Sequence, residues 1–128
     1  MYNEKVMEHF RCPKNMGEIP NADGIGEVGN IKCGDVMKIS IKVGKHDDGK
    51  EYIDDIKFQT LGCAAAIAAS SVTTELAKGK LLDEAEGITK DDINNALGKL
   101  PPVKYHCSIL ADEGIKKAIE DYKSRKNG

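Results

Sequence analysis

A chain of 128 residues with a formal net charge of −2 has room for one domain with its own hydrophobic core, but not for two comfortable ones. Charged residues make up 31% of the chain and the two signs nearly balance, so no broad field favours nucleic acid or an anionic membrane. No apolar run approaches the roughly 18 residues that span a bilayer, and the N-terminus has no signal-peptide pattern. We therefore expect one cytoplasmic domain that binds neither nucleic acid nor membrane.

The N-terminal quarter of the chain predicts a short helix and then a glycine-rich connection. Residues 2–10, YNEKVMEHF, have the apolar spacing of an amphipathic helix, which Pro13 ends. The stretch GEIPNADGIGEVGN, residues 17–30, is rich in turn formers and leads into a strand at about 26–32. We assign residues 1–25 to a mobile N-terminal part and residues 26–128 to the core of a single domain.

Two further strands are indicated by apolar residues at every second position. MKISIKV, residues 37–43, and DDIKFQT, residues 54–60, show the alternation of half-buried strands. The polar turn GKHDDGKE at 44–51 separates them, so they are expected to form an antiparallel hairpin. With the strand at 26–32 they predict a three-stranded antiparallel sheet.

The second half of the chain has helical patterns. After Cys63, apolar residues fall four apart from Ala64 to Leu76, and Gly79 is a suitable stop. TKDDINNAL, residues 89–97, begins with a capping signal and acidic residues. From residue 108 onward one apolar stripe continues to the C-terminus; it comprises Ala111, Ile115, Ala118, Ile119 and Tyr122. The fold class is therefore predicted to be α+β, with helices packed mainly on one face of a small antiparallel sheet.

Three of the four cysteines fall at the ends of these predicted elements. Cys33 lies between two strands, Cys63 lies between a strand and a helix, and Cys107 opens the last helix. In a reducing compartment they are expected to be free thiols, metal ligands or reactive groups rather than disulfides. A helix N-terminus lowers the pKa of a thiol, so Cys63 and Cys107 are predicted to ionise readily.

A shared metal site is one interpretation of these positions. Asp35 stands two residues after Cys33, so both side chains can reach one ion. Sulfur ligands select zinc or an iron-sulfur cluster over magnesium or calcium, and the absence of a C-x-x-C pair excludes a zinc-finger pattern. Each residue also has an ordinary structural interpretation: a small buried hydrophobe for a cysteine, a turn residue for Asp35, and a hydrogen-bonded side chain for His106.

Longer motifs carry a family resemblance over nearly the whole chain. In order, they are YNEKVMEHFRCPKNMGEI, KCGDVMKISIKV, FQTLGCAAAIAASS and LPPVKYHCSILADEGIKKAI. With these motifs the chain resembles the IscU/NifU-type iron-sulfur cluster scaffold proteins. The segment LPPVK followed by a His-Cys pair is similar to the IscU branch rather than to SufU-type proteins.

The resemblance implies a cluster site and the residues that form it. The implied ligands of the nascent cluster or of a zinc ion are Cys33, Asp35, Cys63 and Cys107, with His106 as an alternative ligand. The family gives Cys12 no such role. The implied cofactor is a [2Fe-2S] cluster, or a [4Fe-4S] cluster on a homodimer, with zinc as an occupant of the cluster-free form.

The resemblance also implies a non-enzymatic role and a set of partners. A cysteine desulfurase would pass persulfide sulfur to Cys107, an iron donor or frataxin-like protein and a ferredoxin would supply iron and electrons, and apo-proteins would receive the cluster. An Hsp70-type chaperone with its J-type co-chaperone would dock on Leu100, Pro101, Pro102, Val103 and Lys104. The prolines are expected to keep this segment extended and accessible.

Two other functional classes remain as alternatives at this point. The same ligands could hold zinc in a protein that regulates the desulfurase by binding it. A hydrolytic zinc enzyme is disfavoured, because three thiolates and a fourth ligand leave no open coordination position.

Overall fold

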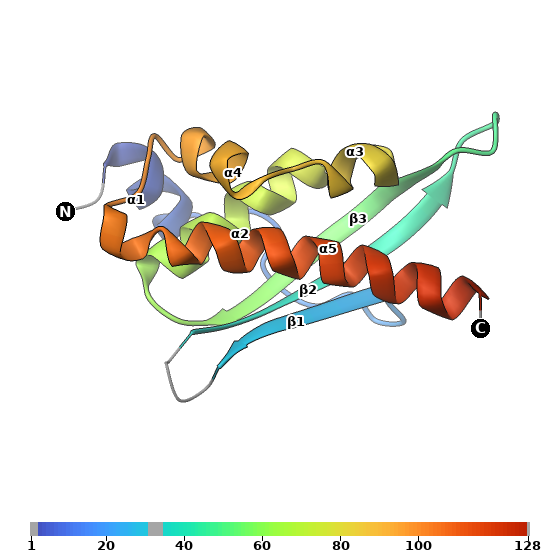
Figure 1. Cartoon of the computed structure of the whole chain (residues 1–128), viewed down its shortest axis with the longest axis horizontal. Helices are drawn as coiled ribbons and strands as arrows, with labels where there is room; N and C mark the ends of the chain where they lie inside the picture. Colours follow the sequence, from blue (N-terminus) through green and yellow to red (C-terminus); the bar gives the residue numbers. More distant parts are fainter. Residues whose placement is uncertain (1–2, 31–34, 128) are drawn as a thin grey trace.

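The sheet has the predicted antiparallel form. The computed structural model describes residues 3–30 and 35–127, apart from the side chains of Asn30, Val103 and Asn127. The strands β1 (Gly24–Asn30), β2 (Asp35–Lys45) and β3 (Glu51–Leu61) form one antiparallel sheet in the order β1-β2-β3 (Figure 1). The β2–β3 hairpin is longer than the alternation predicted, and positions 31–32 of the first predicted strand lie outside the described residues.

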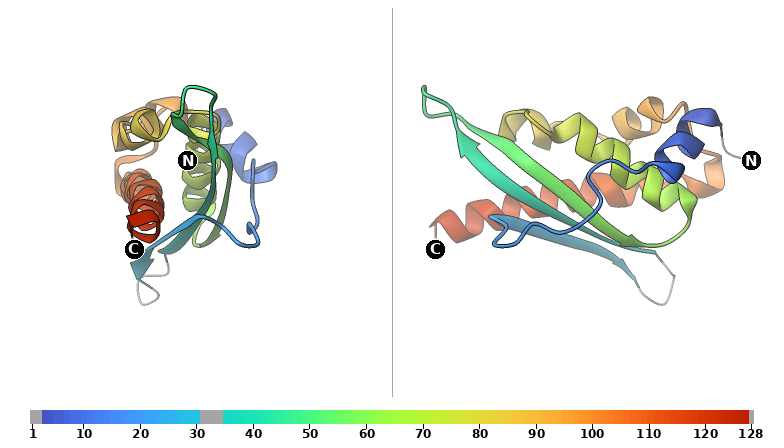
Figure 2. Two further views of the ribbon diagram at one scale, coloured as in Figure 1. Left: turned by 90° about the vertical axis from the view of Figure 1, so that its right-hand side faces the viewer. Right: turned by 180° about the vertical axis from the view of Figure 1, so that it is seen from behind.

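Most helices lie on one face of this sheet, as predicted. The helical elements are α1 (Glu4–Arg11), α2 (Ala64–Ala77), α3 (Leu82–Glu86), α4 (Lys90–Ala96), the 3₁₀ turn η2 (Pro102–Lys104) and α5 (His106–Asn127). Helices α2 and α5 cover one face, and the segment between α1 and β1 runs along the opposite face (Figure 2). The α+β class predicted from the sequence is confirmed.

The core lies between the sheet and the two long helices. On the sheet, the fully buried apolar side chains of β2 and β3 are Met37, Ile39, Ile41, Ile53, Ile56 and Phe58. On α2 the buried face is built mostly from alanines, serines and threonines, which let the helix lie close to the sheet. The apolar stripe predicted on the last helix is confirmed, because its members Ala111, Ile115, Ala118 and Ile119 are all buried. Burial of each large aliphatic side chain contributes about 1.5–3 kcal/mol.

Glycines in β1 allow α5 to lie directly against the sheet. A Cβ atom on Gly24 would lie 2.2 Å from the carbonyl oxygen of Ala118, and one on Gly26 would lie 2.3 Å from that of Gly114. Both contacts are with helix backbone, which cannot move aside cheaply. The close approach fixes the long helix along β1, and thereby fixes where the first turn of α5 meets the end of the sheet.

The short helix α3 was not predicted from the sequence. It has only five residues and no apolar period, and its start is held by the Glu84 side chain, which accepts a hydrogen bond from the Leu81 amide at 3.0 Å.

In α1, only Val6 of the predicted apolar face is fully buried, whereas Phe10 is 40% exposed. Within residues 3–30 and 35–127, no helix is long and apolar enough to cross a membrane.

Candidate functional site

Four of the five predicted ligands come together at one end of the molecule. Asp35 is the first residue of β2, Cys63 is the N-cap of α2 two residues after the end of β3, and His106 and Cys107 are the first residues of α5. Each therefore sits where a rigid element begins. The fifth predicted ligand, Cys33, lies outside the described residues.

His106 connects the carboxylate and the thiol of this group. Its Nε2 lies 2.9 Å from Oδ2 of Asp35 and 3.7 Å from Sγ of Cys107. The His106 side chain is 46% exposed and that of Asp35 is 21% exposed, so the pair lies at the surface. An imidazole and a carboxylate that are predicted to bind one cluster thus contact each other.

The thiol of Cys107 is buried, contrary to the prediction of a readily ionised thiol. Burial, followed by the nearby charges of Cys63 and Asp35 and a hydrogen bond with Cys63, raises the pKa of Cys107 to about 12, and only Lys104 acts in the opposite direction. The side chain has no exposed surface and belongs to the hydrophobic core. The prediction was wrong because the first turn of α5 packs against α2 and the sheet, where desolvation outweighs the helix dipole.

The donor atoms are gathered, but they are paired with one another. Asp35 contacts His106, and Cys63 is hydrogen-bonded to Cys107. In the part of the chain that the structure describes, no three His, Cys, Asp or Glu side chains are placed to hold one metal ion. Thiols together with an imidazole and a carboxylate are donors that suit iron or zinc.

The segment Leu100–Lys104 differs from its prediction in two respects. Pro102–Lys104 form a 3₁₀ turn rather than the predicted extended segment, and the Lys104 amide donates to the Pro101 carbonyl oxygen at 2.8 Å. Leu100 is only 6% exposed, although Pro102 is exposed. The φ of proline is also compatible with the first position of a helical turn, and burial of an apolar side chain outweighs the extended preference.

Sequence reasoning missed the contacts that hold the start of α5 to α4. The Tyr105 hydroxyl donates to the Asp91 carboxylate, and this hydrogen bond is the main cause that raises the pKa of Tyr105. The Lys90 amide donates to Oδ2 of Asp112 at 3.1 Å. No local signal could indicate these pairs, because the partners are far apart in sequence.

One exposed residue beside the site could have been found from the sequence. Leu61 is 69% exposed and stands two residues before Cys63. In β3, Ile56 and Phe58 point into the core, so residue 61 falls on the opposite face.

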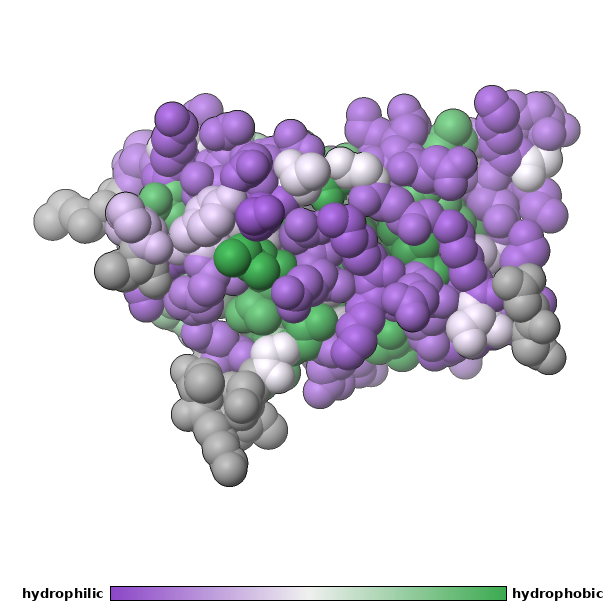
Figure 3. All heavy atoms as spheres, viewed as in Figure 1, coloured by the Kyte–Doolittle hydropathy of each residue, from purple (hydrophilic) through white to green (hydrophobic). Residues whose placement is uncertain are grey.

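On another face of the molecule, most of the surface is hydrophilic and apolar atoms gather over the first half of α5 (Figure 3).

Comparisons with known proteins identify the family of this chain. Residues 1–128 match the family described as NifU-like N terminal domain. A relative from Archaeoglobus fulgidus, named iron-sulfur cluster assembly scaffold protein IscU 1, is 56% identical over 100% of this chain and 80% of its own length. The Escherichia coli protein named iron-sulfur cluster assembly scaffold protein IscU is 53% identical over 98% of this chain and 96% of its own length. This chain belongs to the NifU-like N-terminal domain family.

Within the family, the predicted resemblance to the IscU branch is confirmed by these two relatives. A solved structure supports the fold: an iron-sulfur cluster assembly scaffold protein for the SUF system from Fervidobacterium islandicum superimposes with a TM-score of 0.73. It is 26% identical, and the match covers 92% of this chain and 96% of that one.

Proposed function

We propose that this chain is a cytoplasmic scaffold on which an iron-sulfur cluster is assembled and from which it is transferred to apo-proteins. The observation that carries the proposal is the convergence of Asp35, Cys63, His106 and Cys107 at the starts of three elements. Two relatives that are more than half identical carry the name of such a scaffold, which supports it. The cluster is the cargo of this protein, so the site must release it as well as bind it.

Sulfur arrives as a persulfide from a cysteine desulfurase. The thiolate of Cys107 attacks the terminal sulfur of the desulfurase persulfide, a new S–S bond forms on Cys107, and the desulfurase thiolate leaves. This exchange moves one sulfur without net oxidation or reduction. Each transferred sulfur is then reduced to sulfide by two electrons from a ferredoxin-type donor. Because Cys107 is buried and its pKa is raised, the acceptor must be exposed when the desulfurase docks.

The assembled cluster is held by Cys33, Asp35, Cys63 and Cys107, with His106 available as an exchange ligand. The proposed cargo is a [2Fe-2S] cluster, or a [4Fe-4S] cluster when two copies face each other. A carboxylate is a harder ligand than a thiolate, which makes Asp35 the weakest point of a sulfur-rich site. The hydrogen bond between Asp35 and His106 keeps the exchange ligand next to that point.

Partner proteins are proposed to meet the scaffold at two places. The exposed Leu61 side chain offers apolar contact beside Cys63 to a desulfurase or a recipient protein. The segment Leu100–Lys104 is proposed to dock an Hsp70-type chaperone assisted by a J-type co-chaperone. Iron would come from a frataxin-like donor.

Anaerobic reconstitution tests the proposed function. The purified protein is incubated with ferrous iron, cysteine, a cysteine desulfurase and a reductant that converts persulfide sulfur to sulfide. The visible absorption of a cluster is expected, followed by transfer to an apo-ferredoxin. Stoichiometric zinc with no cluster absorption, together with a changed desulfurase rate, would instead support a zinc-bound regulator, because the same donors suit zinc.

A further inference from the structure

The first described residue of the chain contacts the turn that precedes Leu100. The Asn3 side chain caps α1, because its Oδ1 accepts a hydrogen bond from the Val6 amide at 3.0 Å. Its Nδ2 donates to the carbonyl oxygen of Gly98 at 2.9 Å and lies 3.4 Å from that of Lys99. One side chain therefore joins the start of α1 to residues 95 or more positions away in sequence.

The turn that Asn3 contacts is strained. Gly98 and Lys99 have φ values of +74° and +73°, and a left-handed backbone is unfavourable for lysine because its Cβ crowds the following carbonyl. On its other side the turn is held by Asn94, whose carbonyl oxygen accepts from the Lys99 amide at 2.8 Å. The Asn94 side chain accepts from the Leu100 amide at 2.9 Å. Contacts from α1 and α4 thus maintain a conformation that the local sequence disfavours.

This turn decides how much of the proposed chaperone segment is accessible. After the turn at Gly98 and Lys99, the Leu100 side chain enters the core and is only 6% exposed. The following residues continue into the turn η2. A partner that binds an extended apolar peptide needs Leu100 outside the core. The segment is therefore in a closed form while the turn persists.

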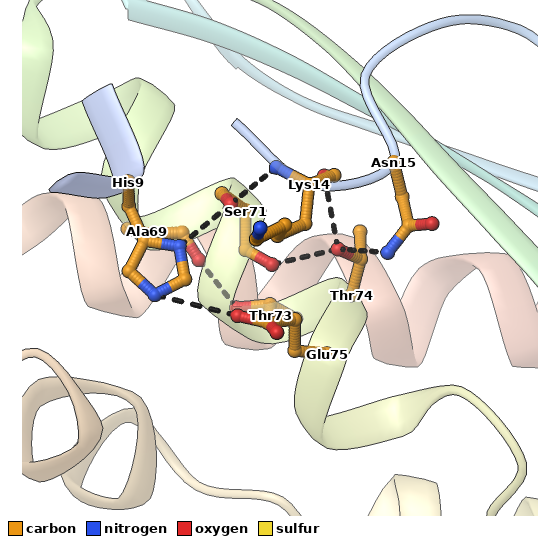
Figure 4. A network of polar contacts seen from close by, with 8 residues as sticks. All are labelled: His9, Lys14, Asn15, Ala69, Ser71, Thr73, Thr74 and Glu75. Atoms are coloured by element: carbon orange, nitrogen blue, oxygen red, sulfur yellow. Dashed lines mark hydrogen bonds and ion pairs between the residues drawn. The ribbon is translucent and has the colours of Figure 1, made fainter. Parts of the chain in front are cut away.

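The other end of α1 is held to α2 by polar side chains (Figure 4). The Ser71 hydroxyl lies 2.7 Å from Nδ1 of His9 and accepts from the Lys14 amide at 2.8 Å. Nε2 of His9 lies 3.4 Å from Glu75, on the next turn of the same helix. Val6 is the one fully buried hydrophobic side chain of α1.

The contacts continue along the segment that follows α1. Asn15 donates to the Thr74 hydroxyl at 3.0 Å, and its carbonyl oxygen accepts from the Phe58 amide at the edge of β3, also at 3.0 Å. We call residues 3–17 the N-terminal arm. Apart from Val6, which belongs to the hydrophobic core, the arm is fastened mostly by hydrogen bonds, which are individually weak and can open locally.

We propose that the N-terminal arm is a clamp that keeps the Leu100–Lys104 segment closed: Asn3 stabilises the strained turn at Gly98 and Lys99, and release of the arm from α2 frees Leu100. The last step, binding of the freed segment by a chaperone, rests on the proposed function. The clamp itself does not, because it is a property of the chain alone.

Amide hydrogen exchange of the whole protein, followed by NMR, tests the clamp. In Asn3→Ser the capping oxygen is retained while the Nδ2 donor is lost. The Lys99 and Leu100 amides are expected to exchange about fivefold faster, the effect of one net hydrogen bond. Ser71→Ala should accelerate the same two amides, although the Ser71 hydroxyl contacts His9 and Lys14 and lies far in sequence from the turn at Gly98.

Ser70→Ala is the matched control. It makes the same substitution in the same helix, but the Ser70 hydroxyl donates to the Ala66 carbonyl oxygen within α2 rather than binding the arm. Exchange of Lys99 and Leu100 should remain as in the unmodified chain. If Asn3→Ser has no effect on these amides, or if Ser71→Ala behaves like Ser70→Ala, the clamp is refuted.

Binding of a purified Hsp70-type chaperone to the same variants separates the two levels of the proposal. Tighter binding of Asn3→Ser and Ser71→Ala, but not of Ser70→Ala, supports the complete proposal. Faster exchange with unchanged chaperone affinity would uphold the clamp and overturn the proposed docking role of Leu100–Lys104.

Discussion

His106 and Asp35, two predicted cluster ligands from opposite halves of the chain, are in direct contact, with Nε2 and Oδ2 2.9 Å apart. In the site proposed above, the contact places the exchange ligand His106 beside Asp35, the carboxylate that a sulfur-rich site binds least strongly. The proposed role of His106 is to occupy the position on iron that Asp35 vacates. The pair is therefore suited to cluster release.

From this pair we predict the effect of Asp35→Ala on cluster lifetime. The variant, once loaded, should hold its cluster longer against a chelator or oxygen and transfer it more slowly than the unmodified protein, because the labile ligand is gone and His106 is freed to bind. Decay of visible absorption and stopped-flow transfer to an apo-ferredoxin measure the two rates. Asp47→Ala, in the exposed hairpin turn, is the control. Faster cluster loss from Asp35→Ala would identify Asp35 as a stabilising ligand.

Substitution of Cys107 should remove persulfide from the scaffold and also lower its stability. An effect on stability is expected because the Cys107 thiol lies in the hydrophobic core. A buried serine hydroxyl without a partner costs about 1–3 kcal/mol, so Cys107→Ser should be less stable than Cys107→Ala in urea. Mass spectrometry after reaction with desulfurase and cysteine measures the persulfide. Persulfide at the normal level on Cys107→Ala would move the acceptor role to Cys63 or Cys33.

The raised pKa of Cys107 also predicts how stability depends on pH. In the unfolded chain the thiol ionises near pH 9.0, whereas in the folded protein its pKa is about 12. Because the folded state favours the protonated thiol, its contribution is complete below pH 9.0 and declines as the pH rises toward 12. The free energy of unfolding should fall by up to about 1.4 kcal/mol per pH unit in that window. Urea titrations at pH 8 and pH 10 measure it. Cys107→Ala should lack this part of the decline, and an equal decline in both proteins would contradict the burial argument.

The alternation of apolar residues was sufficient to predict β2 and β3, since each strand buries one face against the helices. The stripe from Ala111 to Ile119 was likewise sufficient for α5. The sequence could not predict α3, whose five residues hold no period, or the turn η2, where burial of Leu100 determines the path of the chain. A local sequence pattern predicts a helix or strand only when the apolar residues of that element itself form most of the surface that it buries.

For the site, the positions of Cys63 and Cys107 at helix starts followed from the pattern, but their environment did not. The pKa of Cys107 depends on packing against α2 and on the charges of Asp35 and Cys63, which come from other parts of the chain. The contact between Asp35 and His106 joins residues 71 positions apart. Such contacts are set by tertiary structure, and only the family resemblance could indicate them in advance.

Ser108 is predicted to be a destabilising residue. This residue is fully buried, and the structure gives the Ser108 hydroxyl no hydrogen-bond partner among the described residues. Ser108→Ala removes this group and favours the helix, so the free energy of unfolding should rise by about 1 kcal/mol. Urea denaturation measures the change. Ser124→Ala, at an exposed position of the same helix, reports the effect of helix propensity alone. If the two variants gain the same stability, the buried hydroxyl of Ser108 carries no penalty.

The prolines at 101 and 102 should matter for chaperone binding but not for unassisted cluster assembly. In the closed form they begin the turn η2, and once Leu100 is released they restrict the segment to extended conformations. Replacement of both by alanine makes the released segment more flexible, so binding must order more backbone at a greater entropic cost. We expect weaker chaperone affinity, slower chaperone-stimulated transfer and an unchanged rate of reconstitution with desulfurase alone. Calorimetry measures the affinity, and visible absorption measures both rates. Equal affinity of the variant and the unmodified protein would reduce Pro101 and Pro102 to a rigid entry into α5.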